Sequence, residues 1–139
     1  MIALEKSNIL ITGVARNCAF TLISDIEKLS LAFKNAQKIY FLVIESDSDD
    51  GTLDTLNFLS CNNTNFEFIS HGSLTHSLPQ RTNRIAYCRN TYVNEIITND
   101  KYKLIDYVVV ADLDGINSEI SSEAVASCWN YDNWAAMTA

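Results

Sequence analysis

Two aspartates, Asp112 and Asp114, stand one residue apart directly after the apolar run Tyr107–Ala111. A run of this composition predicts a strand that is buried on both faces of a sheet. Open α/β sheets bind their ligands in the crevice outside the carboxyl ends of the strands. Two carboxylates at that point suit a divalent cation that also holds a diphosphate. The pattern therefore indicates an enzyme that uses an activated, phosphate-linked donor.

A second acidic segment follows a predicted strand over 38–45. That strand ends at Glu45 and leads into the turn 46–52, which has the sequence SDSDDGT. Such a turn can bind a nucleoside, with the carboxylate accepting hydrogen bonds from ribose or base. It can equally be a solvated turn in which Asp50 or Thr52 caps the next helix. It lacks the glycine and the terminal glutamate of an EF-hand loop, which argues against calcium.

Arginines mark the predicted helix over 80–98. At 100° per residue, Ile85, Tyr92, Val93 and Ile96 form one apolar stripe, and Arg89 projects from its middle. A guanidinium that faces the sheet needs an anion or carbonyl groups, because an unpaired buried charge is very costly. The position of Arg89 therefore predicts that its guanidinium forms a structural ion pair or contacts a ligand phosphate. Arg84 lies at the polar edge of the stripe, which is typical of a solvated arginine, although it could line the same crevice.

Strands and helices alternate along the chain, and this predicts the fold class. The predicted strands are 8–12, 38–45, 65–70, 107–111 and one that begins near Trp134, and the predicted helices are 17–35, 52–59, 80–98 and 121–128. Asn17 is the predicted N-cap of the first helix, whose apolar face includes Phe20. We expect one α/β domain over 1–139, with a mostly parallel, Rossmann-like sheet covered by helices on both faces.

The composition excludes several classes of function. Hydrophobic residues make up 47% of the chain and charged residues 19%, which favours a folded globule. A formal net charge of -7 argues against general binding of nucleic acid or anionic membranes. Four scattered cysteines without a neighbouring histidine argue against zinc. The chain shows no secretory signal and no membrane-spanning window, so we expect a cytoplasmic protein, free or peripherally bound to a membrane.

Three other nucleotide-binding classes fit the sequence less well. The segment Ile11–Gly13 follows the first strand as in dehydrogenases, but the next five residues contain none of the further glycines of that fingerprint. A P-loop is absent for the same reason. A sugar-phosphate nucleotidyltransferase would share the sheet and the acidic site, but usually has a glycine- and arginine-rich loop and a lysine after the first strand.

Four segments in order, ILITGVARN, VIESDSDDGT, RIAYCRN and VVVADLDG, give the chain a resemblance to a known family. Together they resemble GT-A-fold glycosyltransferases of family 2, in which a Ser-x-Asp-Gly-Thr turn precedes a later Asp-x-Asp motif. Glu45 stands where those enzymes usually have an aspartate. The segment RIAYCRN is also similar to fungal cap-associated mannosyltransferases. The resemblance covers nearly the whole chain.

The resemblance implies a role for each matching position. Asp112 and Asp114 would hold Mn²⁺ or Mg²⁺ against the diphosphate of a UDP- or GDP-linked sugar, with Asp114 preferred as the direct ligand. The other implied contacts are Thr12, Gly13, Val14 and Arg16 beside the nucleotide, Glu45 and Asp47 on base or ribose, and Arg84 and Arg89 on the phosphates or the acidic cluster. The implied reaction is transfer of the sugar to a glycan or lipid-linked acceptor.

Only 25 residues follow Asp114 in the 139-residue chain. Enzymes of this fold continue further, into an acceptor-binding part that supplies the catalytic base in inverting members. We therefore expect a donor-binding half, and no residue stands out as a base. We also expect self-association, or a partner chain, to cover the edge near Trp129 and Trp134. The alternative is a module that binds a nucleotide-sugar without turnover.

Overall fold

The computed structural model describes residues 1–138 of the chain. Its strands are β1 (Asn8–Ala15), β2 (Lys38–Glu45), β3 (Phe66–Ser70) and β4 (Tyr107–Val110), and its helices are α1 (Leu22–Ala32), α2 (Thr52–Asn62), α3 (Arg81–Thr98) and α4 (Ser122–Ser127). Short 3₁₀ turns lie at Leu4–Lys6, Asp100–Tyr102, Asn117–Glu119 and Cys128–Asn130. The α/β class is confirmed, and β2 has the bounds that its sequence predicts.

The four strands form one parallel sheet in the order β3-β2-β1-β4. The chain moves outward from β1 through β2 to β3 and then returns to place β4 on the other side of β1. In open sheets of this kind, the ligand crevice lies where the direction of strand addition reverses. That point here is the carboxyl end of the pair β1 and β4.

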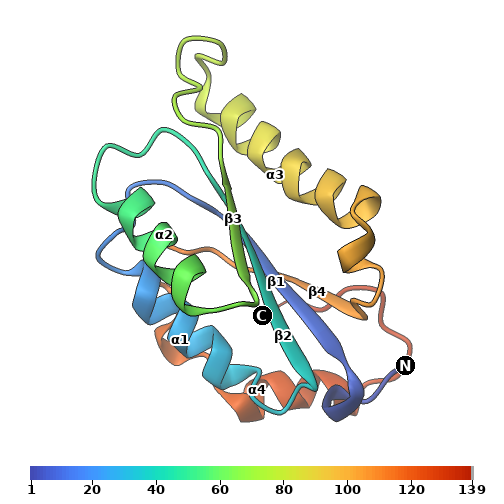
Figure 1. The fold of residues 1–139 in the computed structure, drawn as a ribbon. Coiled ribbons are helices and arrows are strands. Elements are labelled where there is room, and N and C mark those ends of the chain that lie inside the picture. The colour runs from blue at the N-terminus through green and yellow to red at the C-terminus, as the bar shows by residue number, and fades with distance from the viewer. Residues whose placement is uncertain (139) are drawn as a thin grey trace.

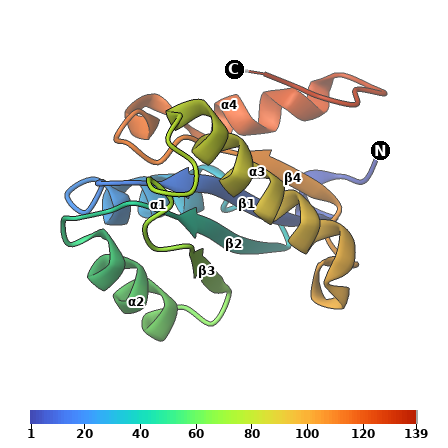
Figure 2. The same ribbon diagram turned by 90° about the horizontal axis from the view of Figure 1, so that it is seen from above.

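Helices cover both faces of the sheet (Figure 1). α1, α2 and α4 lie on one face, and α3 lies on the other, where it packs on β1 and β2. The view from above places α2 beside β3 and α4 toward the β4 end of the sheet (Figure 2). Side chains alternate along a strand. Ile9 and Ile11 of β1 therefore pack in the core that includes α1, and Leu10 packs in the core beneath α3. Because both faces of β1 are buried, apolar residues occupy successive positions of the strand.

The start of α1 differs from the sequence prediction. The helix begins at Leu22 rather than near Asn17, and Phe20 is fully exposed instead of belonging to the buried face. Asn17 adopts a positive φ of 50°, and its side chain bonds to Asp49 across the loop. An asparagine tolerates this conformation because its short polar side chain bonds locally. The polar residues after β1 therefore build a loop, not a helix cap.

β4 is not buried on both faces, which corrects a second prediction. It is an edge strand, and Val108 and Val110 are 44% and 60% exposed on the face that carries α3. The physical reason is that α3 lies over β1 and β2 and does not cover β4. A run of valines indicates a strand, but its composition does not say how far the covering helix reaches.

The segment after α4 also differs from prediction. Residues 134–138 form no strand. Trp134 instead packs with Trp129 and with Tyr107 of β4, at centroid distances of 5.7 and 5.4 Å. Both tryptophans are half-buried, and self-association near them stays a prediction. None of the helices within residues 1–138 combines the length and the apolar composition needed to cross a membrane.

Candidate functional site: an arginine-lined pocket

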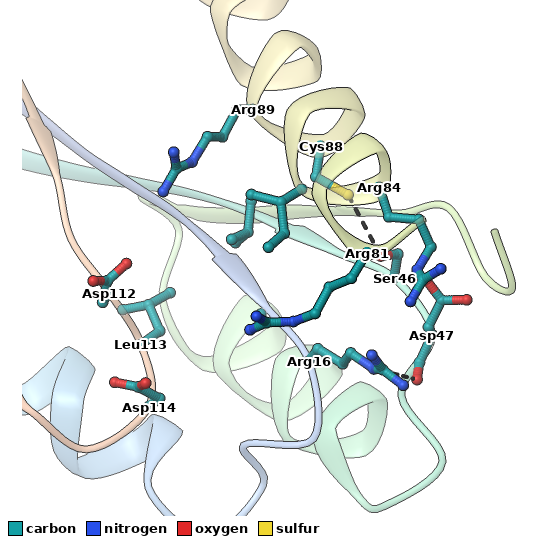
Figure 3. Close-up of a pocket in the computed structure, with 13 residues that line it drawn as sticks. Arg16, Ser46, Asp47, Arg81, Arg84, Cys88, Arg89, Asp112, Leu113 and Asp114 are labelled. Atoms are coloured by element: carbon teal, nitrogen blue, oxygen red, sulfur yellow. Dashed lines mark hydrogen bonds and ion pairs between the residues drawn. The ribbon is translucent and has the colours of Figure 1, made fainter. Parts of the chain in front are cut away.

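A pocket of about 300 Å³ lies at the carboxyl ends of β1, β2 and β4, beneath the first half of α3 (Figure 3). It occupies the reversal point of the sheet, where ligands bind in other open α/β folds. Its lining residues are Val14, Ala15, Arg16, Ser46, Asp47, Arg81, Arg84, Ile85, Cys88, Arg89, Asp112, Leu113 and Asp114. Seven of these belong to the site predicted from sequence: Val14, Arg16, Asp47, Arg84, Arg89, Asp112 and Asp114.

Every arginine in the sequence lines this pocket. The chain contains four, Arg16, Arg81, Arg84 and Arg89, and none of its six lysines belongs to the lining. With Asp47, Asp112 and Asp114 they give the lining four positive and three negative side chains, in a chain whose net charge is -7. A guanidinium binds carboxylate and phosphate groups through two parallel hydrogen bonds, which an ammonium cannot do. The distribution therefore gives the pocket the side chains that an anionic group would need.

Asp112 and Asp114 present their carboxylates to the pocket from a turn anchored between them. Both are exposed, whereas Leu113 is buried in the core between α1 and the sheet. Neither carboxylate accepts a hydrogen bond or joins an ion pair within residues 1–138. Alternation along the extended chain thus places two unpaired carboxylates on the same side of it. The role of this pair as metal ligands stays a prediction.

Gly13 allows this turn to approach β1. A Cβ atom at Gly13 would lie 2.3 Å from the carbonyl oxygen of Ala111 and within 3.3 Å of the Leu113 side chain. No side chain fits at that distance, so only glycine permits the contact. Gly13 therefore shapes the site from beneath rather than lining it.

Thr12 and Glu45 also lie outside the lining. The Thr12 hydroxyl donates to the carbonyl of Leu42 at 2.7 Å, and the buried Glu45 accepts from the Ser48 amide and the Ser70 hydroxyl. Within residues 1–138, the side chains of Thr12 and Glu45 use these hydrogen bonds to connect neighbouring strands and the turn after β2. Their predicted contacts with a nucleotide, like that of Gly13, stay predictions.

Asp47 and Arg84 form a fixed wall of the pocket. Asp47 Oδ1 accepts from the amide of Leu74 and from the amide and hydroxyl of Thr75, at 2.7 to 3.0 Å. Its Oδ2 lies 3.3 Å from Arg84 Nε, and the Arg84 Nη1 donates to the carbonyls of Leu78 and Pro79. Arg84 is buried, so its predicted place at the solvated edge of α3 was wrong, but it does line the pocket, as the alternative prediction had it.

Arg89 is exposed, so its predicted burial against the sheet was wrong as well. The face of α3 that meets the sheet carries Arg84, Cys88 and Tyr92. The apolar stripe read from the sequence is rotated from this face, and Val93 of that stripe is 42% exposed. Because β4 has no helix above it, side chains on that side of α3 remain at the surface.

The bonds to Asp47 also set its ionisation. Desolvation raises the pKa of the Asp47 carboxyl, but hydrogen bonds from Thr75, Leu74 and Ser46 outweigh it, and the pKa is lowered overall. Asp47 is therefore ionised at neutral pH and balances Arg84. Its backbone φ of 58° is in the left-handed region, where the carbonyl can accept from Arg16 Nε at 3.2 Å. Arg16 is thus fixed to the same wall.

The remaining two arginines, Arg81 and Arg89, have no partner among residues 1–138. Neither Arg81 nor Arg89 makes a side-chain hydrogen bond or an ion pair within the described residues. Figure 3 shows Asp112 and Asp114 on one side of the pocket and Asp47 with Arg16 and Arg84 on the other, with Arg81 between them. Arg81 was not among the site residues predicted from the sequence. Its spacing of three residues from Arg84, on one helix, was the available signal.

Cys88 lines the pocket in surroundings that disfavour its reactive form. Burial raises the pKa of the Cys88 thiol despite a hydrogen bond with Ser46, and the nearby Asp47 and Glu45 charges raise it further. The attacking form of cysteine is the thiolate, which this environment disfavours. The thiol donates to Ser46 Oγ at 3.5 Å and packs beneath α3.

The pocket supplies only some of the ligands that a divalent metal ion needs. Within residues 1–138, no group of three or more His, Cys, Asp or Glu side chains is placed to hold a metal ion. Asp112 and Asp114 supply two hard oxygen ligands, and a cation there needs further oxygens from a ligand. Mg²⁺ and similar ions are commonly held by one or two carboxylates together with substrate phosphates. The residues therefore fit a metal that is shared with a diphosphate, not one held by protein alone.

Comparison with known proteins does not identify the chain. No protein-family model matches it. No curated protein matches it either.

Proposed function

We propose that this pocket binds a nucleoside-diphosphate sugar together with Mn²⁺ or Mg²⁺, as the donor-binding unit of a glycosyltransferase of GT-A type. The observation that carries the proposal is the gathering of all four arginines around two unpaired aspartates at the reversal point of the sheet. A diphosphate needs positive charge on several sides. All the guanidinium groups of the chain belong to the lining of this one pocket.

The unpaired side chains are assigned to the ligand. Arg81 and Arg89 contact the diphosphate, because they are the arginines without a partner among the described residues. Asp112 and Asp114 hold the cation against the same phosphates. The cation, when bound, supplies positive charge that stabilises the nucleoside-diphosphate leaving group. Arg16 and Arg84 remain with Asp47 and keep the opposite wall in place.

A second candidate is a module that binds the nucleotide-sugar without turnover. The observation that favours it is the state of the remaining lining groups. Asp47 is occupied by three hydrogen bonds and an ion pair, and the Cys88 thiol is protonated. A general base must be free to take a proton from the acceptor. Apart from the two proposed metal ligands, the described lining offers no such group.

Release of nucleotide separates the two candidates. The protein is incubated with UDP-glucose or GDP-mannose, with Mn²⁺ or with chelator, and free UDP or GDP is measured. The transferase predicts Mn²⁺-dependent release that the Asp114→Ala variant loses. The binding module predicts Mn²⁺-dependent binding with the same dependence on Asp114 and no release. Absence of both binding and release in folded protein would contradict the proposed function.

The arginine assignment is tested separately. Arg81→Ala and Arg89→Ala should each weaken nucleotide binding by about 10- to 100-fold, because a hydrogen bond to a charged group contributes roughly 1.5–3 kcal/mol. Lys34→Ala is the matched control, since it removes one positive charge from an exposed position outside the pocket. Equal affinities for wild type and both arginine variants would overturn the assignment.

A further inference from the structure

A buried carboxylate lies behind the Asp112–Asp114 turn. Asp25 of α1 is 2% exposed and stands on the same helical face as Leu22 and Leu29, which are also buried. Burying an ionised carboxylate among apolar side chains is costly unless hydrogen bonds replace its water. Within residues 1–138 no lysine, arginine or histidine pairs with it. Asp25 therefore depends on the neutral donors that it contacts.

Both of those donors belong to the turn. Asp25 Oδ2 accepts from the amide of Gly115 at 2.8 Å, and Oδ1 accepts from Asn117 Nδ2 at 3.1 Å. The same Nδ2 donates to the carbonyl of Asp112 at 2.7 Å. One amide group thus bridges Asp25 to the first residue of the Asp-Leu-Asp segment, while Gly115 connects Asp25 to the residue after it.

The backbone at Gly115 also lies close to the start of α1. Gly115 has a φ of 94°, which other residues rarely adopt, and a Cβ there would lie 3.0 Å from Thr21 Cγ2. The chain after Asp114 therefore turns tightly against the start of α1. The segment is fixed at Asp112, by the burial of Leu113, and at Gly115.

We propose that Asp25 is a positioning residue, which acts through Gly115 and Asn117 to fix the turn that presents Asp112 and Asp114 to the pocket. The inference rests on the proposed function for its consequence, which is tighter binding of a cation and diphosphate. Asp25 does not line the pocket, so its effect on a bound ligand must pass through the turn. Groups that orient metal ligands from behind typically change metal affinity or activity by about 10- to 100-fold.

Packing alone does not account for a carboxylate at this position. Leu22, Ile26 and Leu29 already bury the same face of α1, and a leucine at position 25 would extend that apolar surface. Replacing buried polar groups by apolar ones of similar shape is often neutral or stabilising. Both oxygens of Asp25 are instead used by the turn. A role in placing that turn accounts for a polar group at this position.

The first variant is Asp25→Leu, with Glu27→Gln as control because Glu27 is an exposed acid on the same helix. The chain has only four glycines, so selective ¹⁵N-glycine labelling gives four amide signals. Amide exchange of Gly115 is measured without metal, and Gly13 in β1 reports on global opening. Binding of UDP and GDP with Mn²⁺ is then titrated in each variant.

The proposal predicts that Asp25→Leu speeds exchange at Gly115 at least tenfold while Gly13 is unchanged. It also predicts nucleotide binding in Mn²⁺ that is about 10- to 100-fold weaker. The paired variant Asp25→Asn with Asn117→Asp exchanges donor and acceptor, so it should restore protection of Gly115 but not the bond to Asp112. Glu27→Gln should match wild type in both measurements.

Other outcomes overturn the proposal. Unchanged exchange at Gly115 in Asp25→Leu would show that Asp25 does not fix the turn, and equal acceleration at Gly13 would show a purely global effect. If Asp25→Leu fails to fold, Asn117→Ala decides, because it should keep Gly115 protected yet weaken Mn²⁺-dependent binding. A wild-type protein that binds neither nucleotide would contradict the proposed function, while exchange at Gly115 would still decide the role of Asp25 in the turn.

Discussion

Two acidic turns follow two strands of this sheet, and they use their carboxylates in opposite ways. After β2, the carboxylates of Glu45, Asp47 and Asp50 all accept hydrogen bonds from the protein. After β4, those of Asp112 and Asp114 accept none within the described residues. Both turns read as clusters of acids in the sequence. The first turn therefore builds a wall of the pocket, and the second leaves its carboxylates free to meet a ligand there.

The bonds of the first turn connect the loops beneath the pocket. Asp50 accepts from the amide and hydroxyl of Thr52 and from the amide of Ala19. Thr52 in turn accepts from the amide of Cys18, and Asn17 and Asp49 bond to each other twice. The turn after β2 and the loop after β1 therefore form one hydrogen-bonded unit. Substitutions there should affect folding before they affect binding.

The largest expected effect is on stability, at Asp47. Asp47→Ala removes the acceptor for Leu74 and Thr75 and leaves the buried Arg84 without its carboxylate. We expect a loss of roughly 3 kcal/mol in the free energy of unfolding, because breaking a buried charge pair leaves an uncompensated charge. Urea denaturation measures it. Asp54→Ala, at an exposed position of α2, is the control, and equal stability of the two variants would contradict the proposed wall.

Gly13→Ala should have the next largest effect. The added Cβ would meet the Ala111 carbonyl at 2.3 Å, so β1 and the chain after β4 must separate. Overpacking of this kind costs about 1–3 kcal/mol. Thermal unfolding gives the loss of stability, and nucleotide titration gives the accompanying loss of affinity. A variant with both properties unchanged would show that the close approach is not needed.

Acid should weaken the first turn in a defined range of pH. The pKa of Asp47 is lowered in the folded protein, and that of Asp50 is lowered chiefly by the Thr52 hydroxyl. Their contribution to stability is therefore complete above the unfolded pKa of about 4 and is lost as pH falls through the folded values. Unfolding free energies at pH 6, 4 and 3 should fall less steeply in Asp47→Asn than in wild type. Parallel curves would contradict this.

The smallest effect on stability is expected at Asp114. Asp114→Ala removes an exposed carboxylate that has no partner in the described residues, so the free energy of unfolding should change by less than about 0.5 kcal/mol. The same variant should lose Mn²⁺-dependent nucleotide binding. Paired denaturation and titration measure the two properties. A large loss of stability would show that Asp114 belongs to the fold, as the acids after β2 do.

The sequence predicted the alternation of strands and helices because strand runs and turn residues are local signals. It did not predict which side of α3 meets the sheet, because that rotation is set by where the helix lies over β1 and β2. Arg84 and Arg89 were therefore assigned to each other's environments. For the same reason β4 was expected to be covered on both faces, although its neighbours leave it at an edge.

The sequence carries a signal for Asp25 of the same kind as the one for Arg89 of α3. It lies three residues after Leu22 and four before Leu29, so it is a charged residue in the middle of an apolar stripe. Its partners were not predictable, because Gly115 and Asn117 are about ninety residues away and meet α1 only in the folded chain. The periodicity of the sequence identifies a charged residue on an apolar helix face, whereas its hydrogen-bond partners are known only from the tertiary structure.

The most direct test is calorimetric titration of UDP and of GDP into the wild-type protein and Asp114→Ala, each with Mn²⁺ and with chelator. The proposed site predicts that one nucleotide binds wild type only when Mn²⁺ is present, and that folded Asp114→Ala does not bind it. Binding that is equal with and without Mn²⁺, or equal in the variant, would contradict a cation shared between Asp114 and the diphosphate. Failure of folded wild type to bind either nucleotide would contradict the site altogether.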